Sequence, residues 1–437
     1  MNNLFKLVMV IAIVGLMFGQ NPNNLLNNGI ARLNAGDLVQ AEELLLQALE
    51  LDPALAAAMV QLAKLNIRKG EMELTQQYLR QAIDSDPSNE EYREEFTRVN
   101  DINTSMAEGS RALNSGLFED AFIAYKGVND NFPFFPEAVY SLGLVKFREK
   151  DFTAAADYFH KTLELNPEHE NARAAIANVA RNTFNEGNNA YRRGDFETAI
   201  ANYKNVLEID ETFYQAQYQI GVIEARLGNI STAIEAYKNS LEINPNFYRG
   251  YYALGLAYKR NGNLDEALVA LERSVEINPG YAKAYGAIGD IYRETEDFDS
   301  AITALRTAIQ VDGSYSKAYV SLGVIFTDQE SFEEAKSNFE LATSLDNKNT
   351  DAWFRLAGVY NHLNDCESAK NAAREALDIK NNLGAAWFEL GIAEYCNGAG
   401  NKTAALNAFE KARNDRTWRT AAEYEIDKIQ NPEKYQK

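Results

Sequence analysis

The sequence predicts an all-α protein, built as a long array of helical hairpins. Two sets of residues recur every 34 positions: aromatic Tyr251, Tyr285, Tyr319 and Trp353, and small Gly255, Gly289, Gly323 and Ala357. Between them, apolar residues recur at three- and four-residue steps, which is typical of one face of a helix. No run alternates apolar and polar residues as a strand does, so we expect almost no sheet. Repeats of this length, each packed on its neighbours, form a solenoid.

Small residues mark the crossing of two helices in each repeat. Eleven copies begin near residues 22, 56, 102, 136, 180, 214, 248, 282, 316, 350 and 384. The eighth position holds Gly29, Ala63, Gly109, Gly143, Gly187, Gly221, Gly255, Gly289, Gly323, Ala357 and Gly391. Alanine follows twelve positions later in most copies, and Thr75 replaces it in the second. Small side chains let two helix backbones approach closely, while larger Leu, Tyr and Phe fill the grooves beside them.

The pattern aromatic-x2-Leu-Gly-x2-Tyr, then Ala-x3-Phe, then Pro resembles the tetratricopeptide repeat (TPR) family. The resemblance runs from residue 22 to residue 419, about nine-tenths of the chain. It implies a right-handed superhelix, an α-solenoid of about eleven helix-turn-helix repeats. It also implies a concave groove lined by the first helix of each repeat, and a role as a protein-binding scaffold.

Two inserts interrupt the register, at residues 90–101 and 170–179, and we expect each to extend the first helix of the following repeat. Such helices reach about 25 residues, or roughly 37 Å. The predicted organisation is TPR 1–2 over 22–89, TPR 3–4 over 102–169 and TPR 5–11 over 180–417. A capping helix and tail over 418–437 follow, because the open end of a solenoid needs a cover.

The N-terminus resembles a secretory signal peptide over residues 1–19. Lys6 precedes an apolar stretch from Leu7 to Phe18, which is too short to span a bilayer comfortably. We therefore expect an exported protein, periplasmic or extracellular, without a membrane span in the mature chain. The alternative is an uncleaved N-terminal anchor.

The charge of the chain limits its partners. With 63 acidic and 43 basic residues among 437, the net charge is −20. This argues against nucleic acid, whose phosphates need dense Lys and Arg, and against broad adhesion to anionic membranes. Solubility explains much of this acidity.

The sequence indicates no catalytic or metal site. His160, His169 and His362 are scattered without a nucleophile beside them, and we expect structural roles for all three. There is no phosphate-binding Gly-rich loop, no zinc-ligand spacing and no Gly-x-Ser-x-Gly turn. We therefore expect a protein that is not an enzyme and takes no cofactor.

The two cysteines, Cys366 and Cys396, fall in the last two repeats. In the TPR family the start of one helix there lies beside the end of the other. Together with an oxidising compartment, the resemblance implies a disulfide between them. The alternative is two unpaired, small apolar residues.

Two rows of residues fall on the surface that the family uses as a groove. The fifth repeat position holds Tyr140, Phe184, Tyr218, Tyr252, Phe354 and Phe388, and the thirteenth holds Arg68, Arg148, Arg192, Arg226 and Arg260. One interpretation is a groove in which rings stack on an extended partner segment while Arg pairs with its carboxylates. The other is that Arg complements helix C-termini and the rings pack between helices.

The predicted function is a non-catalytic protein–protein interaction scaffold of the bacterial cell envelope or periplasm, binding extended or acidic segments. The alternative is a module that binds envelope carbohydrate, peptidoglycan or polysaccharide, by stacking sugars on the groove aromatics. Neither the partner nor the oligomeric state follows from the sequence.

Overall fold

The computed structural model describes residues 21–396 and 400–435, and within these ranges it contains 23 α-helices and no strand. The predicted all-α array of hairpins is confirmed. The predicted signal peptide, residues 1–19, lies outside the described residues. None of the described helices combines the length and the hydropathy that a membrane span requires.

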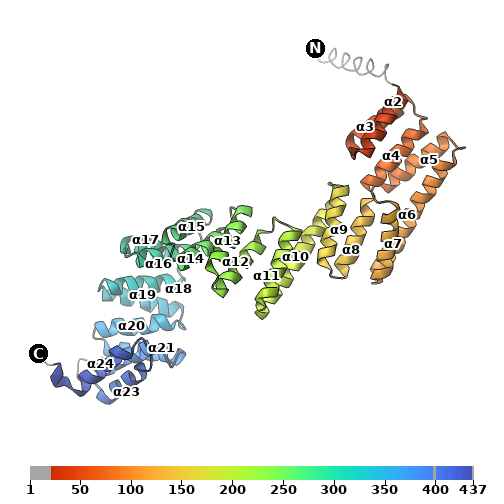
Figure 1. Ribbon diagram of the computed structural model, residues 1–437. Helices are drawn as coiled ribbons and strands as arrows, with labels where there is room; N and C mark the ends of the chain where they lie inside the picture. The colour runs from red at the N-terminus through yellow and green to blue at the C-terminus, as the bar shows by residue number, and fades with distance from the viewer. Residues whose placement is uncertain (1–20, 397–399, 436–437) are drawn as a thin grey trace, which may run out of the picture. The chain divides into compact units, whose positions relative to one another are not determined.

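The first helices of the hairpins carry even numbers in Figure 1. They are α2 (Pro22–Asn34), α4 (Ala56–Lys69), α6 (Glu90–Asn114), α8 (Pro136–Arg148), α10 (Glu170–Arg193), α12 (Tyr214–Leu227), α14 (Tyr248–Arg260), α16 (Ala282–Glu294), α18 (Ser316–Asp328), α20 (Thr350–His362) and α22 (Gly384–Glu394). The second helices are α3 (Leu38–Leu51), α5 (Met72–Ser85), α7 (Phe118–Asn131), α9 (Phe152–Leu165), α11 (Phe196–Ile209), α13 (Ile230–Ile243), α15 (Leu264–Ile277), α17 (Phe298–Val311), α19 (Phe332–Leu345), α21 (Cys366–Ile379) and α23 (Lys402–Ala412). Helix α24 (Arg419–Gln430) and a short 3-10 turn (Pro432–Lys434) follow.

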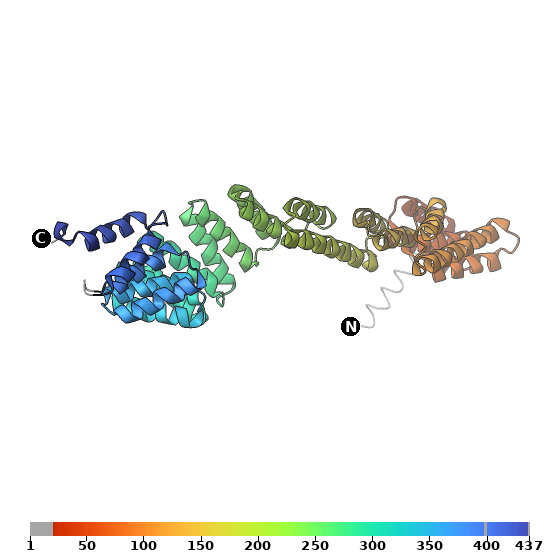
Figure 2. The same ribbon diagram turned by 90° about the horizontal axis from the view of Figure 1, so that it is seen from below.

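The chain forms two compact units, residues 1–213 and 214–437. In each of them, successive hairpins lie side by side (Figures 1 and 2). The two helices of a hairpin pack together because the small residue of the first helix lies under a large side chain of the second. A Cβ atom added at Gly221, for example, would lie 2.6 Å from Cε1 of Tyr237.

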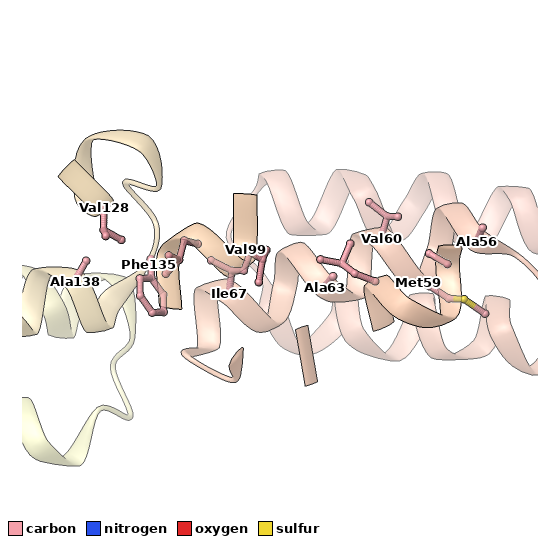
Figure 3. Close-up of a cluster of buried hydrophobic side chains, with 12 residues drawn as sticks. Ala56, Met59, Val60, Ala63, Ile67, Val99, Val128, Phe135 and Ala138 are labelled. Atoms are coloured by element: carbon pink, nitrogen blue, oxygen red, sulfur yellow. The ribbon is translucent and has the colours of Figure 1, made fainter. Parts of the chain in front are cut away.

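Both inserts are helical and continuous with the helix that follows them. Helix α6 has 25 residues and α10 has 24, the lengths that the register predicts. The added turns of α6 carry Val99, which belongs to the core cluster shown in Figure 3, and Phe96, which is partly buried and packs against that cluster.

Packing in that cluster is not limited to neighbouring repeats. It combines Ala56, Met59 and Ile67 of α4 with Phe135 and Ala138, two repeats later (Figure 3). The amide of Asn166, just before α10, also donates to the carbonyl of Lys69 at 3.5 Å. The insert in α6 explains part of this difference, because its extra turns enlarge the apolar surface that α4 and the start of α8 share.

Candidate functional site

The rings at the fifth repeat position each lie between two other side chains, and we call this arrangement the ring ladder. Every ring except Phe354 contacts an aromatic side chain just before the next first helix, or before α24 in the case of Phe388, 29 or 30 positions later. The pairs are Tyr140–His169 at 5.0 Å between ring centroids, Phe184–Phe213 at 5.1 Å, Tyr218–Phe247 at 5.0 Å, Tyr252–Tyr281 at 5.2 Å and Phe388–Trp418 at 4.9 Å. On the other side, Tyr140, Phe184, Tyr218 and Phe388 contact a ring of their own second helix.

The ladder rings are therefore half-buried, and much of each ring packs within the array. Phe354 has no ring partner among the described residues, but it packs in a cluster with Leu383, and its ring centroid lies 5.2 Å from the guanidinium carbon of Arg355. Packing between helices accounts for part of the aromatic row, and the remaining exposed part is available to a partner.

The ladder is densest on the first helices of the second unit. We define the tyrosine cluster as Tyr218, Tyr248, Tyr252, Tyr281 and Tyr315. Tyr281 contacts both Tyr248, at 5.0 Å, and Tyr252, at 5.2 Å, each time edge to face. Such contacts suit the ring quadrupole. The cluster thus brings three consecutive repeats together through hydroxyl-bearing rings.

Tyr315 takes the place of a missing ring. The fifth position of that repeat is Gly286, and a Cβ atom there would lie 2.7 Å from Cε1 of Tyr315. The absence of a side chain at Gly286 lets the Tyr315 ring lie against the helix. Asp290, one turn further along α16, accepts a hydrogen bond of 2.7 Å from Ser321.

Burial and mutual proximity raise the pKa values of Tyr252, Tyr281 and Tyr315 in the cluster. Burial raises the pKa of Tyr281 to about 12, helped by Tyr252, Tyr218 and Tyr248 and opposed by Arg249. The pKa of Tyr252 is raised by burial and then by Asp290, and the pKa of Tyr315 rises for similar reasons. The hydroxyl groups therefore stay protonated at neutral pH and can donate or accept hydrogen bonds.

A row of cations borders the cluster at the second repeat position. Arg249 on α14, Lys283 on α16 and Lys317 on α18 follow one another at 34-residue intervals, and all three are exposed. Arg249 donates through Nε to the hydroxyl of Tyr248 at 3.1 Å. Because α14 contacts α16 and α16 contacts α18, we treat these three residues as one surface feature, the cation row.

The five predicted arginines divide by environment. Arg68 donates to the carbonyl of Leu33 at 2.6 Å and Arg260 to that of Ala225 at 2.7 Å, in each case one repeat earlier. Arg192 donates to Asn189 within its own helix, at 3.0 Å. Arg148 and Arg226 are exposed at the ends of their helices. Part of the row therefore complements helix C-termini.

The structure joins Cys366 and Cys396 in a disulfide with a Cα–Cα distance of 5.9 Å, the pairing that the family resemblance implied. The histidines have structural contacts. His160 lies 3.0 Å from the carbonyl of Ile209, His169 accepts from the backbone N–H of Ala172 at the start of α10, and His362 stacks on Phe332. Within the described ranges, no group of three or more His, Cys, Asp or Glu side chains is placed to hold a metal ion.

The sequence prediction missed Tyr248, Tyr281, Tyr315 and the cation row. A signal for them was present, because Phe213, Phe247, Tyr281 and Tyr315 recur every 34 residues just before the first helices. So do Arg249, Lys283 and Lys317.

Family comparisons match repeat models to most of the array. Tetratricopeptide repeat models match residues 26–90, 106–180, 187–228, 223–262 and 248–281. A model described as the tetratricopeptide repeat protein 21 C-terminal ARM domain matches residues 266–385. No curated protein matches the chain.

Three solved structures resemble parts or most of the chain. MamA from Desulfovibrio magneticus RS-1 is 25% identical, with 39% of this chain and 96% of that chain covered and a TM-score of 0.36. A tetratricopeptide repeat protein from Parabacteroides merdae is 14% identical, with 58% and 99% covered and a TM-score of 0.44. Yeast Tom70 is 17% identical, with 95% and 90% covered and a TM-score of 0.40. The repeat models, and the helical hairpins of the residues that they match, show that this chain belongs to the tetratricopeptide repeat family.

Proposed function

We propose that the tyrosine cluster and the cation row together bind an extended, acidic segment of a partner protein. Proteins of this family act as protein-interaction scaffolds. The observation that carries the proposal is the alignment of Arg249, Lys283 and Lys317 along hydroxyl-bearing rings in a chain of net charge −20. Cations on such a surface attract carboxylates, and rings with polar tips provide contact area at low entropic cost.

The ring geometry supports a peptide over a sugar. Stacking on a sugar needs an open ring face, whereas Tyr248, Tyr252 and Tyr281 cover one another edge to face. Their hydroxyl groups and edges suit the backbone and side chains of an extended segment. The binding of a peptide held by cations should also weaken as the ionic strength rises, while the stacking of a neutral sugar should not.

The test is chemical cross-linking in the native cell, followed by identification of captured partners. The variant Lys283→Glu with Lys317→Glu should bind its partners about tenfold more weakly, which is a loss of about 1.4 kcal/mol of binding free energy. Less partner should therefore be captured. The control is Arg306→Glu with Lys348→Glu, an equal charge change at exposed positions that are not part of the cation row. Arg192→Glu with Arg226→Glu tests the arginine row in the same way. Equal capture by wild type, the Lys283/Lys317 variant and the control, at unchanged helical content, would refute the proposal.

We also propose that the protein acts in the bacterial cell envelope or periplasm. The support is Lys6 followed by the apolar stretch Leu7–Phe18, together with a disulfide, which persists in oxidising compartments. N-terminal sequencing of the protein from fractionated cells should give a chain that begins near Gln20. An intact N-terminus on cytosolic protein would contradict this placement.

A further inference from the structure

The two helices of repeat 7 line a groove that includes no residue of the cation row. Its apolar lining comes from Tyr251, Leu254 and Tyr258 of α14 and from Val269 and Ala270 of α15, and its volume is about 530 Å³. Val269 is 67% exposed, although it is a large apolar side chain. Binding sites are usually concave and lined mainly by apolar and aromatic side chains with a few polar groups, as this groove is.

Carboxylates surround this apolar lining. Asp265, Glu266, Glu272 and Glu276 all line the groove, and Arg273 is the one basic residue in that set. Arg273 already donates to Glu276 at 2.8 Å. The groove therefore combines an apolar floor with a rim of net negative charge.

A cation from the preceding repeat already lies against one of the lining rings. The ammonium group of Lys238 on α13 lies 5.9 Å from the centroid of the Tyr258 ring. This distance is within the range of a cation–π interaction. Rings and carboxylates in the same groove can thus hold basic side chains by two kinds of attraction.

The next repeat shows that this combination is not a general feature of the array. The positions equivalent to Val269, Glu272 and Glu276 are Thr303, Arg306 and Gln310, each 34 residues later. Both the apolar side chain and the two carboxylates are lost there. The groove of repeat 7 is therefore a local property of α14 and α15.

We propose that this groove binds a cationic amphipathic segment of a partner protein. An apolar side chain of the segment packs on Val269 and the tyrosine rings, while its Lys or Arg side chains pair with Glu272, Glu276 and the neighbouring carboxylates. Charge complementarity selects this occupant over an acidic segment, because like charges across an interface cost binding energy. The inference is independent of the proposed function, which uses the cation row at the start of the first helices.

The test uses the full chain and a fluorescein-labelled 14-residue peptide in which Lys and Leu are placed for an amphipathic helix. A second peptide, with Glu in place of every Lys, is the matched probe. Fluorescence anisotropy should show binding of the Lys peptide only, with an affinity that falls as salt is added. Val269→Asp should weaken this binding about tenfold although it adds negative charge, since it removes the apolar contact.

Charge removal provides the second arm. Glu272→Gln with Glu276→Gln should weaken binding about tenfold at low salt and reduce its salt dependence. The control is Glu375→Gln with Asp378→Asn, which removes two exposed carboxylates from α21. If Val269→Asp binds like wild type, or the control weakens binding as much as the groove variant, the attraction is only that of an acidic protein and the proposal fails. Lys283→Glu with Lys317→Glu should leave this binding unweakened, which separates it from the proposed function.

Discussion

The guanidinium of Arg260 donates a hydrogen bond of 2.7 Å to the carbonyl of Ala225, which lies 35 positions earlier. Arg68 makes the equivalent bond to Leu33. In both cases the acceptor lies in the last turn of the preceding first helix, where carbonyls lack intrahelical partners and the helix dipole favours a cation. These two arginines therefore connect neighbouring repeats.

Replacing Arg260 should consequently destabilise the array. Arg260→Met keeps the length of the side chain but removes the donor, and the free energy of unfolding should fall by about 1 kcal/mol. The measurement is urea unfolding followed by circular dichroism. Arg148→Met is the matched control, because Arg148 has the same repeat position, is exposed and shows no hydrogen bond or ion pair among the described residues. Equal losses for the two variants would contradict a specific role for the bond.

Glycine-to-alanine substitutions at two sites of one hairpin should change the free energy of unfolding in opposite directions. A Cβ atom at Gly109 on α6 would lie 2.6 Å from Cε1 of Tyr125, so Gly109→Ala should destabilise by about 1–3 kcal/mol. A Cβ atom at Gly127 on α7 meets nothing within 4 Å. Gly127→Ala should therefore stabilise by about 0.5–1 kcal/mol, as Ala favours a helix over Gly. Thermal unfolding of both variants decides the matter, and a shift in the same direction would refute this account of the helix crossing.

The sequence was sufficient for the fold because close helix crossings demand small residues at fixed spacing. Gly109 and Gly221 could be placed for that reason, and the helical character of residues 90–101 followed from their apolar spacing. The contact of α4 with Phe135 was not foreseen, since it depends on the path of the long helix α6 in space.

The site was predicted less completely than the fold. The sequence placed Tyr252 on the groove surface, but the fraction of the ring covered by Tyr281 depends on the turn before α16. It also could not decide the role of Arg260, because one guanidinium can satisfy a carbonyl of the array or a carboxylate of a partner. The position of Tyr315 required the observation that Gly286 leaves room for it.

The Cys366–Cys396 disulfide should stabilise the C-terminal repeats. It closes a segment with a sequence separation of 30, and a loop of this length contributes about 3.6 kcal/mol in the chain-entropy description. The unreduced, denatured protein should show no reactive thiol, and two after reduction. Cys366→Ser with Cys396→Ser should unfold at the same urea concentration as reduced wild type. Two reactive thiols before reduction would refute the pairing.

Glu389 should make stability depend on pH. Burial raises the pKa of this carboxyl from 4.5 to about 7, although the amide of Asn361 donates to it at 2.8 Å and opposes the shift. Between these two values the folded chain keeps a proton that the unfolded chain releases. The resulting stabilisation is fully present below about pH 4.5 and is lost as the pH rises through about 7.

The variant Glu389→Gln should remove this dependence. It keeps the shape of the protonated side chain and cannot ionise, so at pH 8 it should be more stable than wild type by about 3 kcal/mol. At pH 4 the two proteins should unfold alike. Urea unfolding at pH 4, 6 and 8 gives the three points needed, and Glu375→Gln, an exposed position on α21, is the control. The opposite result would be a wild type that gains stability relative to Glu389→Gln as the pH rises from 5 to 8. That result would show that the fold holds this carboxyl in its charged form instead.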